Sequence, residues 1–251
     1  MAFPDRRDAA GHDGHAAYFV LDDRPNDAKW LSGSQKDLLT INLSIENRTD
    51  SRSGLQAFLS ALRRPTLWVA TFGYFSVTWA GMVLNFWTPT IIQRSGVANL
   101  FQIGLLSAVP YAVGAIGMLV LCRNSDRTLE RHWHFFAAVF MAGCAALAVA
   151  YASWSSALSI VCLAVLAVGY LSAVALFWTI PTSFLSEQES AGSIAFISSA
   201  GQIGSLIAPT LFGYVLQQTG SLTMGACFVT VILIAGGFAI LSLRSLRPNQ
   251  G

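Results

Sequence analysis

Charged residues are scarce in this sequence. Only 11% of the 251 residues are Asp, Glu, Lys or Arg, whereas a soluble domain carries about 25%. No such residue occurs between Arg131 and Glu187, or between Glu189 and Arg244. Because a membrane-spanning helix needs about 20 apolar residues, each uncharged block is too long for one span and fits two. The scarcity of charge therefore argues against an ordinary soluble domain.

Signals for catalysis, metals and nucleic acid are also missing. The sequence contains no P-loop, dinucleotide fingerprint or nucleophile elbow. Its four cysteines lie in apolar blocks, where they are expected to be packed as small hydrophobic side chains. His12 and His15 have a ligand-like spacing but stand in a polar tail without further ligands. Because these signals are missing, we expect no enzyme activity, cofactor or metal site. The small net charge of +2 predicts no nucleic-acid partner.

Six apolar segments predict an all-α polytopic membrane protein. Irregular backbone is not tolerated in hydrocarbon, so these segments are expected to be helices in the lipid bilayer. We predict a hydrophilic, partly disordered segment over residues 1–64, and a six-helix transmembrane domain over residues 65–245. The expected spans are Leu67–Ile92, Gln102–Cys122, Phe135–Tyr151, Ala157–Phe177, Ile194–Leu216 and Thr223–Leu243.

Arginine is distributed unequally between the loops. When the loops are assigned alternately to two sides, one side has Arg94 alone. Cytoplasmic loops retain positive charge, so the other side is expected to be cytoplasmic, with both termini there. The arginines on that side are Arg63, Arg64, Arg123, Arg127, Arg131, Arg244 and Arg247.

The turn "RNSDRTLERHWH" (123–134) contains a charge cluster with two interpretations. Asp126 could pair with arginines of the loop or of a facing helix, which would make Asp126, Arg127 and Arg131 a gating latch between two helices. Alternatively, the turn is simply solvated, and its surface ion pairs contribute at most about 1 kcal/mol each. The residues alone favour the second interpretation slightly.

Several stretches resemble the anion:cation symporter family of the major facilitator superfamily, which transports phthalate, tartrate, hexuronate and related organic anions. The resemblance covers residues 20–247, and its order and spacing carry more weight than any single piece. The stretches that carry it are "DRPNDAKWL" (23–31), "FWTPTII" (86–92), "SDRTLERHWH" (125–134) and "FWTIPTSFLSEQESAGSIAFISSAGQIGSLIAPTLFGYVLQQTGS" (177–221).

The resemblance implies one half of a twelve-helix secondary transporter in an inner (plasma) membrane. Such a carrier moves a small organic anion together with a proton or cation between two six-helix halves. This chain matches helices seven to twelve. Residues 1–19 do not resemble the sixth helix, so we expect a truncated or frame-shifted reading frame, or a misassigned start. A complementary N-terminal half is then an expected partner.

Neutral polar and aromatic residues within the spans are candidates for substrate binding, because no charged residue lies there to mark a path. Buried polar side chains can instead bond neighbouring helices together, and this alternative is favoured for Ser198 and Ser199. Trp178 fits an interfacial position better than a ligand contact. The candidates for substrate binding are Tyr74, Asn85, Tyr170, Trp178, Ser198 and Gln202.

Three other roles remain open: a non-transporting remnant or interaction subunit, a carrier formed by two copies, and a membrane enzyme. The lack of an intramembrane cation argues against the second, and the lack of a catalytic set argues against the third. Close helix contacts are predicted at pairs of small residues four apart. These pairs are Gly104/Ala108, Gly169/Ala173 and Gly204/Ala208.

Overall fold

The computed structural model describes Gly33, Lys36, Gln56, and residues 58–152, 155–185 and 187–245. The chain divides into two compact units, Met1–Leu55 and Gln56–Gly251. In the first unit only Gly33 and Lys36 are described, and both are helical. Most of the predicted hydrophilic segment 1–64 therefore lies outside the described residues.

Helices form the second unit, and the described residues contain no strand. Six of the helical segments are long and apolar enough to cross a membrane, which confirms the predicted fold class and number of spans. The elements are α3 (Pro65–Met82), the π-helical turn η1 (Val83–Trp87), α4 (Thr88–Arg94), α5 (Leu100–Thr128), α6 (Arg131–Tyr151), α7 (Ser156–Phe177), the 3-10 turn η2 (Pro181–Ser183), α8 (Glu187–Thr219) and α9 (Leu222–Ser245).

Local sequence signals mark several helix ends. Pro65 begins α3, where its missing N–H costs nothing. The side chain of Asn99 accepts a 2.9 Å hydrogen bond from the backbone N–H of Phe101 and caps α5. Gly220, at φ 66°, follows α8 in the left-handed conformation that ends many helices. Leu129 ends α5 at φ 54° without the freedom of glycine.

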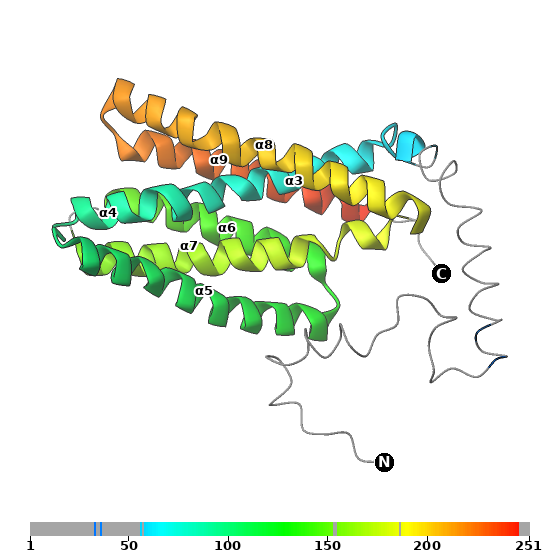
Figure 1. Cartoon of the computed structure of the whole chain (residues 1–251), viewed down its shortest axis with the longest axis horizontal. Coiled ribbons are helices and arrows are strands. Elements are labelled where there is room, and N and C mark those ends of the chain that lie inside the picture. The colour runs from blue at the N-terminus through cyan, green and yellow to red at the C-terminus, as the bar shows by residue number, and fades with distance from the viewer. Residues whose placement is uncertain are drawn as a thin grey trace, which may run out of the picture. The chain divides into compact units, whose positions relative to one another are not determined.

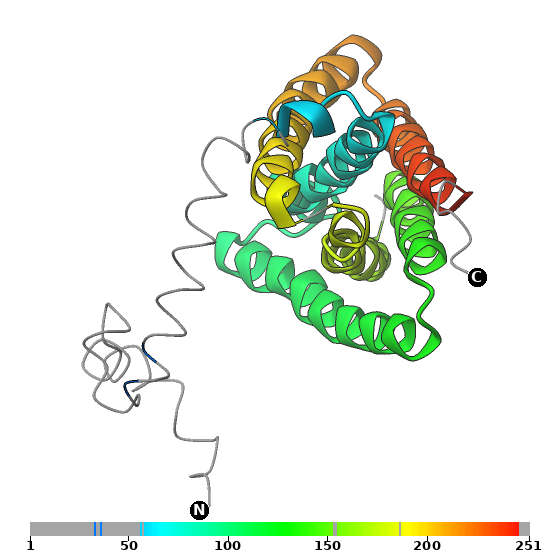
Figure 2. The same cartoon turned by 90° about the vertical axis from the view of Figure 1, so that its right-hand side faces the viewer.

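The helices run antiparallel and form a bundle in which α3 and α7 are central. Figure 1 shows α3, α8 and α9 together in the upper part of the bundle and α5, α6 and α7 in the lower part. Viewed along the helices in Figure 2, α5 and α8 lie at the outside. In the most apolar part of each span, 78% of the residues of α3–α4 are buried, but only 11% of those of α5. The exposed face of α5 is thus available to lipid or to another chain.

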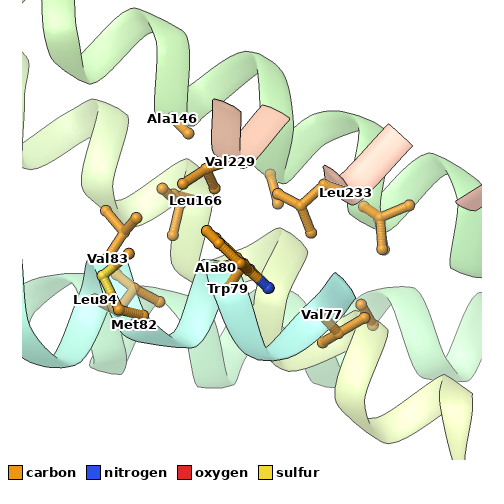
Figure 3. Close-up of a cluster of buried hydrophobic side chains, with 14 of the residues drawn as sticks. Val77, Trp79, Ala80, Met82, Val83, Leu84, Ala146, Leu166, Val229 and Leu233 are labelled. Carbon is orange, nitrogen blue, oxygen red and sulfur yellow. The ribbon is translucent and has the colours of Figure 1, made fainter. Parts of the chain in front are cut away.

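Aliphatic and aromatic side chains fill the centre of the bundle. Figure 3 shows residues of α3 meeting Ala146 of α6, Leu166 of α7, and Val229 and Leu233 of α9. Among the described residues, Trp79 is the largest fully buried side chain, and its ring centroid lies 5.4 Å from that of Phe228 on α9. This core holds α3 in place against α9, on the side of α3 away from α8.

Glycines set the closest helix contacts. A Cβ atom on Gly169 of α7 would lie 2.6 Å from the carbonyl oxygen of Ala138 in α6, and one on Gly204 of α8 would lie 2.7 Å from that of Phe75 in α3. The predicted contacts at these two glycines are confirmed. The prediction at Gly104 is wrong, because no atom lies within 4 Å of its Cβ position. Gly104 belongs to the peripheral helix α5, which exposes this glycine to the outside.

Charged side chains gather at one end of the bundle, which we call the arginine-rich end. It is formed by the start of α3, the α5–α6 turn, the start of α8 and the end of α9. Arg94, the last residue of α4, lies at the opposite end of the bundle. This end carries Arg64, Arg123, Arg127, Arg131 and Arg244. The helix directions therefore place these arginines together, as the loop assignment predicts.

Candidate functional site

A polar cavity of about 370 Å³ lies between α3, α7 and α8, within the size range of small-molecule sites. Because Asn85, Phe86 and Gln202 are exposed, the cavity opens to one side of the bundle. Its wall contains no Asp, Glu, Lys, Arg or His. The lining residues are Tyr74, Val77, Thr78, Gly81, Met82, Asn85, Phe86, Tyr170, Val174, Gln202 and Ser205.

The structure brings four of the six substrate-site candidates together in this cavity, namely Tyr74, Asn85, Tyr170 and Gln202. They come from three helices that are distant in the sequence. The role of these residues in substrate binding stays a prediction. What the arrangement provides is a neutral, hydrogen-bonding surface in an otherwise apolar bundle.

Asn85 lies in the π-helical turn η1, four residues before Pro89. Proline lacks a backbone N–H and its ring clashes with the carbonyl four residues earlier, which here belongs to Asn85. The widened turn relieves that clash, and such turns are frequent at functional sites. The Asn85 side chain bonds back to the helix, with Nδ2 donating to the carbonyl of Gly81 at 2.8 Å.

Tyr111 of α5 is a polar neighbour of the site that sequence reasoning missed. Its hydroxyl donates a 2.9 Å hydrogen bond to Oδ1 of Asn85, and thereby joins α5 to the π-helical turn. Nothing in the sequence pairs these residues, because they lie on different helices. Thr78 and Ser205 were missed too, although they follow Tyr74 by four residues and Gln202 by three.

Two tyrosine rings of the cavity rest on glycines of a facing helix. A Cβ atom on Gly81 of α3 would lie 2.8 Å from Cζ and from the hydroxyl oxygen of Tyr170 on α7. A Cβ atom on Gly201 of α8 would overlap the ring of Tyr74 on α3. Each ring occupies the space that a side chain would take, so these two glycines determine how far the rings reach into the cavity.

Gln202 and Thr78 form hydrogen bonds that shape the α8 side of the cavity. The hydroxyl of Ser205 lies 2.9 Å from Oε1 of Gln202, which leaves the Gln202 amide N–H groups directed elsewhere. Thr78 Oγ1 lies 2.7 Å from the carbonyl of Phe75 and 3.3 Å from that of Gly201. The Ser205 and Thr78 hydroxyls are the donors in these contacts, so their oxygens can still accept, while the Gln202 amide N–H groups remain as donors for a ligand.

Trp178 and Ser198 are not among the residues that line the cavity. Trp178 directly follows α7 and packs its ring 4.9 Å from the ring of Tyr74, so it supports a cavity residue from behind. Ser198 lies on α8 one turn before Gln202 and is half-buried, and Ser199 is exposed. Trp178 and Ser198 therefore do not line this cavity with Gln202, and a role in substrate binding stays a prediction for both.

The charge cluster of the α5–α6 turn contains a contact between Asp126 and an arginine of the next helix, and its role as a gating latch stays a prediction. Asp126 is 70% exposed and lies 4.0 Å from Arg131 at the start of α6, a separation at which exposed pairs contribute little. Arg127 is also exposed. The pair that joins this turn to a third helix is Glu130 with Arg244 of α9, at 2.9 Å. The sequence pointed to the correct turn, but the acidic residue that pairs with a distant helix is Glu130, four residues after Asp126.

A second ion pair joins the start of α3 to the start of α8. Arg64 Nη2 lies 2.9 Å from Oε1 of Glu189, and its Nη1 lies 3.3 Å from Oε2. The Glu189 side chain is only 7% exposed, whereas that of Arg64 is 53% exposed. Neither residue was singled out as paired from the sequence.

The described residues contain no group of three metal-binding side chains.

Relatives of known sequence agree with this architecture. A putative tartrate transporter of Agrobacterium vitis is 33% identical over 239 residues, which cover 94% of this chain and 52% of the relative. A quinolone resistance transporter of Acinetobacter baumannii is 32% identical over 87% of this chain and 50% of the relative. Sodium-dependent phosphate transport protein 1 of Rattus norvegicus is 29% identical over 93% of this chain and 44% of the relative.

This chain thus spans about half the length of the curated relatives that it matches. The family model of the Major Facilitator Superfamily matches residues 15–209. Together with the six antiparallel apolar helices and the polar cavity between them, this match shows that the chain is a multi-pass membrane protein that belongs to the Major Facilitator Superfamily.

Proposed function

We propose that this chain forms one six-helix half of a secondary transporter for small organic anions. The observation that carries the proposal is the neutral, hydrogen-bonding cavity between α3, α7 and α8, in a chain one third identical to a putative tartrate transporter. Amide and hydroxyl donors suit the oxygen atoms of a carboxylate or of a hydroxyl group. The activity is transport rather than catalysis.

The complementary half would supply the charged groups. A carboxylate needs a cation for tight binding, and a coupled proton needs a titratable acid. Apart from residues near their ends, such as Arg94, Arg123 and Arg131, the six spans contain no Asp, Glu, Lys or Arg. In the proposed carrier the two halves rock about the cavity, as in other transporters with midplane sites. The coupling ion, a proton or another cation, would then bind to the partner half.

Binding of tartrate to the purified chain tests this proposal. In lipid nanodiscs we expect saturable binding of radiolabelled tartrate by equilibrium dialysis. Its dissociation constant should be on the order of 1 mM because only neutral groups contribute. Gly81→Ala should weaken binding about fivefold, since the new methyl group displaces the Tyr170 ring. Gly104→Ala is the matched control, because open space surrounds that position.

Two results would contradict the proposal: no saturable binding, or equal affinity of the two alanine variants and the unsubstituted chain. Cells that express this chain without a complementary half should not accumulate tartrate. If they did so at a rate well above that of empty cells, the partner half would be unnecessary. The remnant alternative would be supported by a folded chain that binds no anion at all.

The proposed orientation places the arginine-rich end in the cytoplasm of a cell with this chain in its inner membrane. It follows from the excess of arginine at that end. In a chain whose four cysteines are replaced by alanine, we expect Arg94→Cys to react with a membrane-impermeant maleimide in intact cells. Arg127→Cys should react only after the membrane is opened. Reaction of both positions in intact cells would refute this orientation.

A further inference from the structure

We propose that Asn85 and Tyr111 form a subsite that recognises a hydroxyl group of the substrate, so that the preferred anions are hydroxycarboxylates. This inference rests on the proposed function and names its substrate class. Asn85 lines the cavity from the π-helical turn. Tyr111 of α5 is not among the lining residues, and it takes part by donating a hydrogen bond to Asn85. No sequence pattern pointed to their contact.

The hydrogen bonds fix which way the Asn85 amide faces. Nδ2 uses one of its two N–H groups on the carbonyl of Gly81, and Oδ1 accepts from the Tyr111 hydroxyl. One N–H on Nδ2 and one lone pair on Oδ1 are left. The Tyr111 oxygen, which donates its proton to Asn85, can itself still accept. Asn85, the member of the pair that lines the cavity, thus has one donor and one acceptor site left for a ligand.

This combination matches a hydroxyl group better than a carboxylate. A carboxylate only accepts hydrogen bonds, and the acceptor oxygen of Asn85 would repel it. A hydroxyl group donates one bond and accepts others, so it can use both kinds of site. A substrate without the hydroxyl would leave these groups desolvated and unpaired, which is the stronger basis for discrimination.

The position of the pair also separates hydroxyl recognition from charge recognition. The lining of the cavity contains no cation, so the carboxylates of the substrate have no charged partner on this wall. Gln202 and Tyr170 stand on other helices around the same cavity. They can hold the substrate against α7 and α8 while the hydroxyl group faces the π-helical turn.

Competition between two dicarboxylates of equal length tests the subsite. Tartrate carries hydroxyl groups on its two central carbons and succinate has none. In nanodiscs we expect unlabelled tartrate to displace radiolabelled tartrate at about one tenth of the succinate concentration. Tyr111→Phe removes the hydroxyl that orients Asn85, and should reduce this ratio to about two by weakening tartrate alone. Tyr151→Phe is the matched control, since Tyr151 is exposed at the end of α6.

The outcomes separate this inference from the proposed function. Equal displacement by tartrate and succinate, or an equal loss for both in Tyr111→Phe, would overturn the subsite and leave anion binding intact. If neither tartrate nor succinate binds, both the subsite and the proposed function are overturned. Asn85→Leu provides a second variant of similar size, and it should abolish the preference for tartrate even if Tyr111→Phe fails to fold.

Discussion

Substitution of Gly169 by valine is expected to prevent stable packing of α7 on α6. Any Cβ at this position would lie 2.6 Å from the carbonyl oxygen of Ala138 and 2.8 Å from the backbone nitrogen of Ala142. These are backbone atoms of a facing helix, so a side-chain rotation cannot relieve the overlap. Overpacking costs about 1–3 kcal/mol where neighbours can adjust. Because whole helices would have to separate here, we expect at least the upper value.

The cost is high for a further reason that applies to membrane helices. Between helices in lipid, association depends on close van der Waals contact, because lipid is as apolar as the side chains it would replace. Separating α6 from α7 therefore removes the interaction that favours their association. It also disturbs the cavity, since Tyr170 follows Gly169 directly on α7.

Thermal unfolding in detergent, followed by circular dichroism, measures this effect. Gly169→Val should give mostly aggregated protein, and any soluble fraction should unfold well below the unsubstituted chain. Gly104→Val is the matched control, because the same side chain would there meet open space. If the two valine variants unfold at the same temperature, the contact between α6 and α7 does not limit stability.

The spans were predictable from the sequence, because long uncharged blocks have few alternatives in a membrane. The ends of the spans were less predictable. α5 continues to Thr128, beyond the predicted end at Cys122, because its last turns are polar yet still form backbone hydrogen bonds. Spacing of small residues located the contacts of Gly169 and Gly204. It failed at Gly104, since spacing alone does not tell whether another helix lies opposite.

The site was predictable only in part. Tyr74, Asn85, Tyr170 and Gln202 stand out as polar side chains within apolar spans, and the structure brings them to one cavity. Tyr111 has the same chemistry, but its importance depends on the helix that faces it. Ser198 was chosen because it lies one turn from Gln202, and a turn moves a side chain about 5.4 Å along the axis. The cavity continues from Gln202 in the other direction, to Ser205.

Charge pairing was the least predictable feature. The sequence drew attention to Asp126 because of its arginine neighbours, yet those neighbours are solvated with it. The buried carboxylate belongs to Glu189, whose partner Arg64 is 125 residues away in the sequence. Burial depends on which helix ends meet, so a local sequence pattern could not distinguish Glu189 from the exposed acids.

The Arg64–Glu189 pair predicts an unequal effect of its two single substitutions. Arg64→Ala removes a charge partner from a carboxylate that is almost fully buried. Removing one partner of a buried ionic contact costs about 1–3 kcal/mol or more. Glu189→Gln instead leaves an arginine that is more than half exposed and that water can solvate. We therefore expect Arg64→Ala to be the more destabilising of the two, by about 1 kcal/mol or more.

The double variant determines whether the buried charge is the cause. Adding Glu189→Gln to Arg64→Ala neutralises the carboxylate, so the double variant should be more stable than Arg64→Ala alone. Stability can be measured by unfolding with increasing amounts of sodium dodecyl sulfate, while the concentration of the solubilising detergent is held fixed and helix content is the signal. If the packing of the arginine stem were responsible instead, the second substitution would restore nothing. A double variant less stable than Arg64→Ala would thus show that Glu189 stabilises the start of α8 without its partner arginine.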